Sequence, residues 1–174
     1  MIIRHQFLHK ECQQQYVWHL LEFLKNTRNN RNVLKNQFHP KHQTRIEQED
    51  WYYNDYSKDE NHLIYIVYDE EKQQKIGYIQ IKFESLIHRR CQLHYVVANE
   101  FAEHKYDNKI IRLGLKIIRS CEDEYHRVFS MIFPEDEKRL EHYVFNGFEI
   151  DGVLRAYVYR DNIYRDIMVL SKLL

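Results

Sequence analysis

The sequence is poor in the residues that interrupt a chain, with only 4 glycines and 2 prolines among 174 residues. The three cysteines, Cys12, Cys91 and Cys121, form no Cys-x-x-Cys pair. Their odd number favours free thiols in a reducing cytosol over a disulfide framework. No apolar run is long enough to span a bilayer, and the start MIIRHQFL is too short and too interrupted for a signal peptide. We therefore expect a cytoplasmic protein with no membrane partner.

An excess of charge of either sign is also lacking. Lysine and arginine number 26, aspartate and glutamate number 26, and the formal net charge is +0. A balanced chain lacks the broad basic footprint of a nucleic-acid-binding protein, so no nucleic-acid partner is expected. Hydrophobic residues make up 44% and charged residues 30%, which is typical of a globular protein. The length fits a single domain covering residues 1–174.

The apolar residues change several times between a strand pattern and a helix pattern. Strands are predicted over residues 2–8, 62–69, 76–84, 91–98, 126–133, 148–160 and 164–173, and helices over 11–26, 46–59, 107–121 and 136–146. The polar stretch 27–45 is expected to be a broken helix and a loop. This order predicts an α/β protein with a mixed sheet and helices on both of its faces.

Three motifs, taken with this order of strands and helices, resemble those of a known protein family. They are HYVFNGFEIDGVLR (142–155), YRDIMVLSKLL (164–174), and LHYVVANEF (93–101) leading into the 107–121 helix. Together they resemble the GNAT superfamily of acetyl-CoA-dependent N-acetyltransferases over almost the whole chain. The resemblance implies a GNAT-like fold of mixed α+β character, whose central twisted, mostly antiparallel sheet has about seven strands.

A finer likeness involves the stretch TRNNRNVLKNQF and the following IEQEDWYYND. These segments are similar to the branch that holds ribosomal-protein N-terminal and nucleotide-amino-sugar acetyltransferases, with the pseudaminic-acid-pathway type closest. The function that this implies is acetyl transfer to a primary amine, most directly that of a UDP-linked amino sugar. A protein N-terminal or side-chain amine is the alternative acceptor, and a homodimer is among the expected assemblies.

The family's cofactor turn has an unusual sequence here. Family members usually carry Arg or Gln, two residues, Gly, one residue, then Gly or Ala, which lets backbone amides approach the pyrophosphate of CoA. The stretch AEHKYDNK instead places Ala102, Lys105 and Asp107 at these positions. Either the turn binds acetyl-CoA in a variant way, or the chain is a non-catalytic binding protein. The residues expected to contact acetyl-CoA are Val96, Val97, His104, Lys105, Tyr106, Asp107, Asn108, Lys109 and Asp136.

Within the turn, His104, Lys105 and Lys109 are candidates to supply the missing positive charge. Asp107 would repel a phosphate if it pointed inward, and the alternative is that it caps the helix and points outward.

The catalytic candidates are one tyrosine and two groups that accept protons. The resemblance implies that Tyr143 protonates the sulfur of the leaving CoA, while spacing alone also fits a core aromatic beside Leu140 and Val144. A tyrosine with its ordinary pKa of about 10 is protonated at neutral pH and is able to donate. Glu84 and His94 are the candidate bases, each with a structural alternative, and water is a third proton acceptor.

The acceptor amine is expected to bind at the early helices and the strand ends. Arginines suit a nucleotide diphosphate, and aromatic rings suit stacking on a base or sugar. The candidates are Arg28, Arg31, Trp51, Tyr52 and Gln80. A solvated basic loop and an ordinary aromatic helix face would explain the same pattern.

Metal binding is not expected from the sequence. His88, Cys91 and His94 are three residues apart in HRRCQLH, a spacing that suggests zinc. Successive side chains of a strand point to opposite faces, so Cys91 would point away from both histidines, and no fourth ligand is near.

Overall fold

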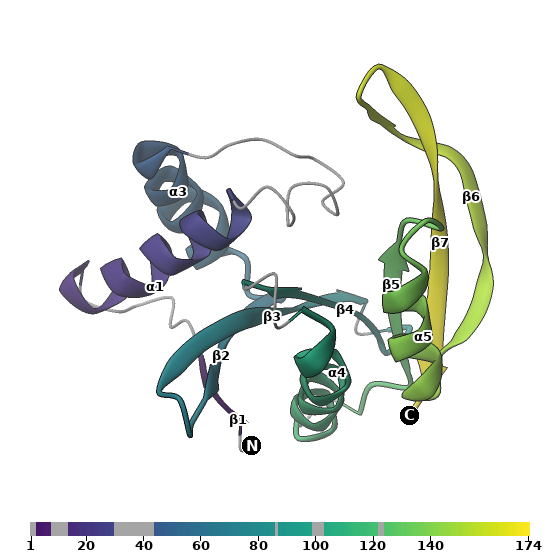
Figure 1. Ribbon diagram of the computed structural model, residues 1–174, viewed down its shortest axis with the longest axis horizontal. Helices are drawn as coiled ribbons and strands as arrows, with labels where there is room; N and C mark the ends of the chain where they lie inside the picture. The colour runs from purple at the N-terminus through teal and green to yellow at the C-terminus, as the bar shows by residue number, and fades with distance from the viewer. Residues whose placement is uncertain (1–2, 8–13, 30–43, 86, 99–102, 122–123) are drawn as a thin grey trace.

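A seven-stranded sheet forms the centre of the computed structural model (Figure 1), which describes residues 3–7, 14–29, 44–85, 87–98, 103–121 and 124–174. The strand order is β1-β2-β3-β4-β5-β7-β6. The strands are β1 (Ile3–Phe7), β2 (His62–Asp69), β3 (Gln74–Ser85), β4 (Arg90–Val97), β5 (Arg127–Ile132), β6 (Glu149–Arg160) and β7 (Ile163–Leu173). Among the described residues, only β4 and β5 pair in parallel, so the prediction of a mostly antiparallel sheet of about seven strands is confirmed.

Helices lie on both faces of this sheet, as predicted. They are α1 (Gln14–Arg28), α3 (Arg45–Asp50), α4 (Glu103–Arg119) and α5 (Glu137–Phe145). The chain continues from α3 through a π turn, Trp51–Asp55, and a 3-10 turn, Tyr56–Lys58. Among the described residues, no helix is long and apolar enough to cross a membrane.

Strand β4 separates two apolar cores because its side chains alternate between the faces of the sheet. Leu93, Tyr95 and Val97 pack with the apolar side of α4 and with Tyr143 of α5. Val96, on the opposite face, packs with residues of α1 and of the turns that follow α3. Strand β4 therefore contributes side chains both to the core under α4 and α5 and to the core under α1.

Helix α4 begins earlier than the sequence indicated. We predicted a helix over 107–121 preceded by a cofactor turn, but the helix runs from Glu103 to Arg119. No glycine or proline lies between Glu103 and Lys109, so nothing in this stretch interrupts helical hydrogen bonding. Lys105 is therefore a helical residue, and the prediction that it lies in a turn before the helix is wrong, whereas Asp107 is helical as predicted.

Candidate active site

Strands β4 and β5 part after three residue pairs. Their parallel register ends at Gln92↔Phe129, although β4 continues to Val97 and β5 continues to Ile132. On its other edge, β4 stays paired with β3 as far as Gly77↔Val97. Residues 93–97 therefore have one edge paired with β3 and one edge with no ladder to β5. This opening lies beside Val96 and Val97, two of the residues that the family resemblance predicted to contact acetyl-CoA.

The backbone amides of this part of β4 face alternate edges. The amide of Ala98 donates to the carbonyl of Ile76 at 2.7 Å, which directs it toward β3. Because amide direction alternates along a strand, the Val97 amide faces the opening and the Val96 amide faces β3. Of the two valines predicted to contact acetyl-CoA, Val97 turns its backbone amide toward the opening, whereas the Val96 amide belongs to the β3 ladder.

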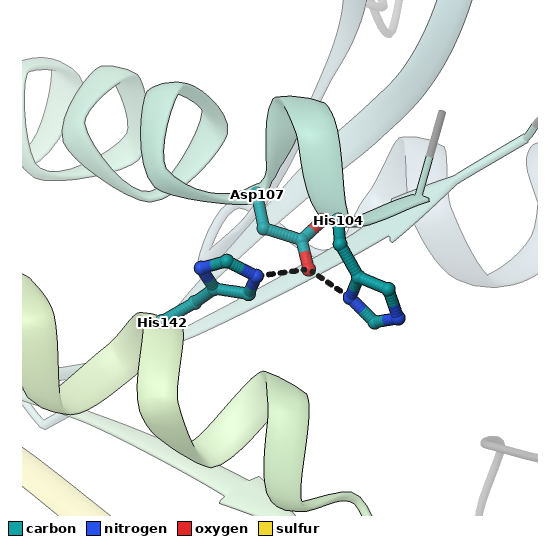
Figure 2. A group of neighbouring side chains, drawn as sticks. All are labelled: His104, Asp107 and His142. Atoms are coloured by element: carbon teal, nitrogen blue, oxygen red, sulfur yellow. Dashed lines mark ion pairs between the residues drawn. The ribbon is translucent and has the colours of Figure 1, made fainter. Parts of the chain in front are cut away.

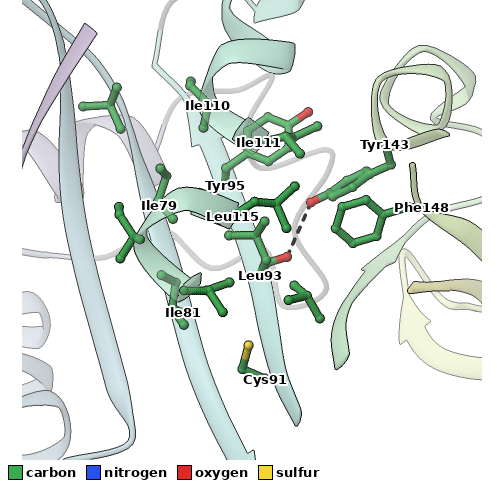
Figure 3. Packing of buried hydrophobic residues seen from close by; sticks show 14 of the residues in the cluster. Ile79, Ile81, Cys91, Leu93, Tyr95, Ile110, Ile111, Leu115, Tyr143 and Phe148 are labelled. Carbon is green, nitrogen blue, oxygen red and sulfur yellow. Dashed lines mark hydrogen bonds between the residues drawn. The ribbon is translucent and has the colours of Figure 1, made fainter. Parts of the chain in front are cut away.

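Tyr143 reaches the opening from α5 (Figure 3). Its hydroxyl lies 3.4 Å from the carbonyl oxygen of Leu93, the first residue of β4 beyond the last pair with β5. The hydroxyl of Ser130, on β5, donates to the Tyr143 oxygen at 2.8 Å. The Tyr143 side chain is only 1% exposed, and burial raises its pKa to about 12. Tyr143 is thus a protonated donor that lies between the two diverging strands.

The turn after α5 explains the Tyr-x-x-x-Gly-Phe motif. Gly147 has φ +82°, a left-handed conformation that ends the helix without the steric cost of a Cβ. The amide of Phe148 then donates to the carbonyl of Tyr143 at 3.1 Å. The Phe148 ring packs edge-on against the Tyr143 ring, with centroids 4.9 Å apart. The motif therefore fixes both the end of the helix and the position of Tyr143.

Arg139 is a buried cation near Tyr143 that sequence reasoning missed. It precedes Tyr143 by four residues on α5, so the two side chains share one face of the helix. Its guanidinium carbon lies 5.0 Å from the centre of the Tyr95 ring, and the residue is only 7% exposed. The signal in the sequence was the arginine within the apolar stripe of this helix, four residues before the candidate acid.

Asp136 has a structural place at the start of the same helix. Its carboxylate accepts from the amide of Arg139 at 3.3 Å as the N-cap, and lies 3.4 Å from the Arg139 guanidinium. These two contacts account for Asp136 without the cofactor contact that the sequence suggested.

The two candidate bases are not brought to Tyr143. Glu84 lies near the end of β3 and pairs with Arg90 at 3.4 Å, at the end of β4 where β4 and β5 are still paired. His94 is the register partner of Gln80, on the face of α1 and α3. Burial, followed by the charge of Arg139, lowers the pKa of His94 to about 3. An imidazole with so low a pKa holds a captured proton weakly.

The predicted acceptor residues divide into three groups. Arg28 and Trp51 are in contact, with the guanidinium carbon 4.3 Å from the centre of the indole ring, and Gln80 is half-buried on β3. Tyr52 is 0% exposed within the core between α1 and the sheet, so its side chain is core and does not line a pocket. Arg31 lies outside the described residues.

The first turns of α4 hold the residues predicted to contact CoA. Lys105 is exposed, Asn108 and Lys109 are half-buried, and the Tyr106 hydroxyl donates to Asp69 at 2.6 Å inside the protein. Asp107 is completely buried, so the alternative that it caps the helix and points outward is wrong.

The Asp107 carboxylate points toward two histidines (Figure 2). Its Oδ2 atom lies 3.4 Å from Nδ1 of His104 and 3.7 Å from Nε2 of His142, and the two imidazole rings stack at 5.7 Å. Burial, followed by the nearby His104, lowers the pKa of His142. Asp107 therefore joins α4 to α5.

Comparison with solved structures gives the fold a clear match. The chain is similar to the spermidine N-acetyltransferase from Vibrio cholerae in complex with CoA and spermine, with a TM-score of 0.83, 20% identity, and coverage of 98% of this chain and 95% of that chain. A chimera of Vibrio cholerae SpeG and hSSAT gives 0.81, 19% identity, and 98% and 95% coverage. A point mutant of the Vibrio cholerae enzyme gives 0.78, 21% identity, and 98% and 93% coverage.

No family model matches the sequence, and no curated protein matches it. The structural likenesses extend over nearly the full length of both chains. The chain thus has the acetyltransferase fold that the resemblance to the GNAT superfamily predicted.

Proposed function

We propose that this chain is an acetyl-CoA-dependent N-acetyltransferase acting on the primary amine of a small molecule. The observation that carries the proposal is the position of the Tyr143 hydroxyl, 3.4 Å from Leu93 O where β4 leaves β5. Acetyl-CoA would supply a thioester carbonyl there. Thioester aminolysis is helped by a backbone amide that holds the carbonyl oxygen and by an acid that protonates the leaving sulfur. The edge of β4 without a ladder to β5 would supply the amide, and Tyr143 would supply the acid.

The residues at the opening have separate roles in this proposal. The Val97 amide, which faces the opening, holds the thioester carbonyl by a backbone hydrogen bond. The neutral amine attacks the carbonyl carbon, the carbon–sulfur bond breaks, and Tyr143 gives its proton to the leaving thiolate. The amine's own proton passes to water, because neither Glu84 nor His94 lies beside Tyr143 in the part of the chain that the structure describes.

A polyamine is a better-supported acceptor than a UDP-linked amino sugar. The solved structure quoted above contains spermine, and none of the comparisons supports the pseudaminic-acid-pathway type. The case for a nucleotide diphosphate came from arginines. Arg28 is buried, lies over the Trp51 ring, and donates to Gln48 Oε1 at 3.3 Å. Its guanidinium is thus already used within the protein.

Cofactor binding is the first thing to test, because Lys105 and Asp107 stand where the family usually has small residues and lie within α4. CoA should stabilise the protein in a thermal-shift titration. At a CoA concentration 100 times its dissociation constant, the free energy of unfolding should rise by about 2.7 kcal/mol. Absence of any shift at millimolar CoA would instead favour a non-catalytic binding protein.

Acceptor choice is then tested by thiol release from acetyl-CoA. Spermidine, spermine, a UDP-linked 4-amino sugar and a short peptide with a free N-terminus are compared at equal concentration. We expect the polyamines to give the highest kcat/KM. A protein that binds CoA and releases thiol only with the amino sugar would overturn the choice of acceptor while leaving acetyl transfer intact.

A further inference from the structure

Two helices bring three metal-binding side chains together at one point. His104 and Asp107 lie one turn apart on α4, and His142 lies on the facing side of α5 (Figure 2). Their ligand atoms all lie within 4.8 Å of one another. His104 is 39% exposed at its side chain and His142 is 19% exposed, whereas Asp107 is completely buried. The cluster is therefore open to solvent on one side and anchored by a buried carboxylate on the other.

The two distances from the Asp107 carboxylate are close to the separation of two ligand atoms on a tetrahedral ion. Asp107 Oδ2 lies 3.4 Å from the His104 nitrogen and 3.7 Å from the His142 nitrogen. Both distances exceed the usual length of about 2.7–3.2 Å for a hydrogen bond from nitrogen to oxygen. Two ligand atoms bound to one zinc ion by bonds of about 2.0–2.1 Å are about 3.3 Å apart in tetrahedral geometry. The two carboxylate distances are close to this separation.

The hydrogen bonds behind His142 determine which of its nitrogens carries the proton. Asn146 Nδ2 donates to the His142 carbonyl at 2.7 Å, and Asn146 Oδ1 accepts from Arg112 Nε at 3.1 Å, so the orientation of this amide is fixed. The same Nδ2 donates to Asn108 Oδ1 at 2.9 Å. Asn108 Oδ1 is thus an acceptor, and the nearby Nδ1 of His142, at 3.2 Å, must be the donor.

With Nδ1 held by Asn108, Nε2 is the His142 nitrogen that faces Asp107 Oδ2, across 3.7 Å. A metal ion between these two atoms would be bound by both. Histidines that bind metals commonly donate their other ring N–H to an oxygen of a neighbouring residue, which sets their tautomer and orientation. Asn108 supplies such an oxygen to His142.

We propose that His104, Asp107 and His142 bind a divalent transition-metal ion, with Zn²⁺ the best match. Two imidazole nitrogens and one carboxylate oxygen suit zinc, whereas magnesium and calcium prefer oxygen ligands alone. Three protein ligands leave a fourth position for water or for an external ligand. The ion ties the first turns of α4 to α5 next to Tyr143. The proposal rests on the geometry of these three side chains and needs no acetyl transfer, although His104 and Asp107 were also predicted to contact CoA. The ligands, 38 residues apart from His104 to His142, formed no local motif.

Direct metal binding tests the site without any measurement of activity. Tag-free protein, stripped with a chelator, is titrated with Co²⁺ and followed by visible absorption. We expect one equivalent to give the bands of a low-coordinate cobalt complex, and Zn²⁺ to displace it. His104→Ala, at a half-exposed position that does not disturb the core, should weaken Co²⁺ binding at least about tenfold. The matched control is His88→Ala, an exposed histidine of the rejected strand cluster, which should bind Co²⁺ like the wild type.

The supporting oxygen gives a second variant. Asn108→Ala removes the oxygen that accepts from His142 Nδ1 and leaves both histidines in place. It should lower the affinity for the metal ion about 10–100-fold. The proposal is overturned if Co²⁺ gives no bands, or if His104→Ala leaves them unchanged. In that case Asp107 is a buried carboxylate that joins α4 and α5 through His104 and His142 without a metal ion. The melting temperature of each variant is measured in the presence of chelator. A value equal to that of the wild type shows that the variant is folded.

Discussion

Tyr143 is the residue on which the proposed acetyl transfer depends most directly. Replacing it by phenylalanine keeps the packing against Phe148 and Tyr95 and removes only the hydroxyl. A positioned general acid contributes about 10²–10⁴-fold to rate, so Tyr143→Phe should lower kcat by about 10²-fold or more. The dissociation constant for CoA should change little, because the hydroxyl acts on the leaving sulfur. Steady-state kinetics and a CoA titration together measure both effects.

An exposed tyrosine provides the control for this variant. Tyr159 lies on β6 with 60% of its surface exposed, so Tyr159→Phe should leave kcat unchanged. Wild-type turnover by Tyr143→Phe would remove the acid role and leave the tyrosine as a core aromatic. The sequence alone allowed Tyr143 to be either a catalytic acid or a core aromatic. Its buried position beside Leu93 is compatible with both roles.

The lowered pKa of His94 predicts how the stability of the protein changes in acid. In the unfolded chain its imidazole protonates near pH 6.5, whereas in the folded protein burial and the charge of Arg139 lower its pKa to about 3. The unfolded state therefore binds the extra proton between these two values. His94 contributes stability above pH 6.5 that is lost as the pH falls toward 3.

Urea denaturation at several pH values measures this contribution. Between pH 6.5 and pH 4 the free energy of unfolding of the wild type should fall more steeply than that of His94→Gln, which has no group titrating there. Parallel curves for the two proteins would show that His94 is protonated equally well in the folded and unfolded states.

At the scale of elements, the contact between β3 and β4 depends on Gly77. A Cβ added there would lie 2.1 Å from the carbonyl oxygen of Val96, a backbone atom held in the sheet. Gly77→Ala should therefore destabilise the protein by about 2–3 kcal/mol and displace β4, the strand that carries the opening. Gly152→Ala is the matched control, because nothing lies within 4 Å of its added Cβ, and its effect should stay within about 0.5 kcal/mol.

Chemical denaturation of the two alanine variants gives both values. Equal stability of Gly77→Ala and Gly152→Ala would mean that β3 and β4 move apart easily, and that β4 is not held rigidly at the opening.

The order of elements was predictable because most of them have a strong local pattern. The alternation in IGYIQIKFE and the helical spacing of Ile110, Ile111 and Leu115 each gave an element of the correct type. The helix buries these residues in one core, whereas β3 buries Ile79 and Ile81 in one core and Tyr78 in the other. The start of α4 was missed because the family pattern suggested a turn there. The residues present, from Glu103 to Lys109, contain no helix breaker, and local helix formation prevailed.

The candidate site was predictable only where a motif is continuous in sequence. Tyr143 is fixed by the Gly147–Phe148 turn four residues later, so its motif located it. Arg139 lies beside Tyr95 only after α5 packs against the sheet, and Asp107 meets His142 only where α4 and α5 touch. Such contacts between distant segments leave no spacing in the sequence from which they can be inferred.

At the scale of the whole molecule, the residues predicted for the two sides of the reaction lie on opposite faces of the sheet. Tyr143 and α4 pack on one face, while Arg28, Trp51 and His94 belong to the face of α1 and α3. The opening after Gln92 is where β5 no longer pairs with β4. A donor held at the α4 side and an amine held at the α1 side would therefore meet at this gap in the sheet.

The same packing buries several tyrosines, and their burial predicts how the stability of the fold responds to alkali. Burial raises the pKa of Tyr106 and of Tyr143 to about 12, and it also raises the pKa of Tyr56 and Tyr95. In the unfolded chain these phenols ionise near pH 10. Between about pH 10 and 12 the unfolded state therefore releases protons that the folded state keeps, and the free energy of unfolding falls as the pH rises.

The loss should begin near pH 10 and be steep, with Tyr143 alone contributing about 2 kcal/mol by pH 12. Urea midpoints from pH 8 to pH 12 measure the stability, and tyrosinate absorbance measures ionisation in the same samples. Absorbance of the folded protein should lag behind that of the urea-unfolded protein until the fold is lost, after which the two should coincide. If instead the folded protein reached full tyrosinate absorbance by pH 10.5 with its urea midpoint unchanged, these hydroxyls would be open to solvent. The dry environment that keeps Tyr143 protonated beside β4 would then not exist.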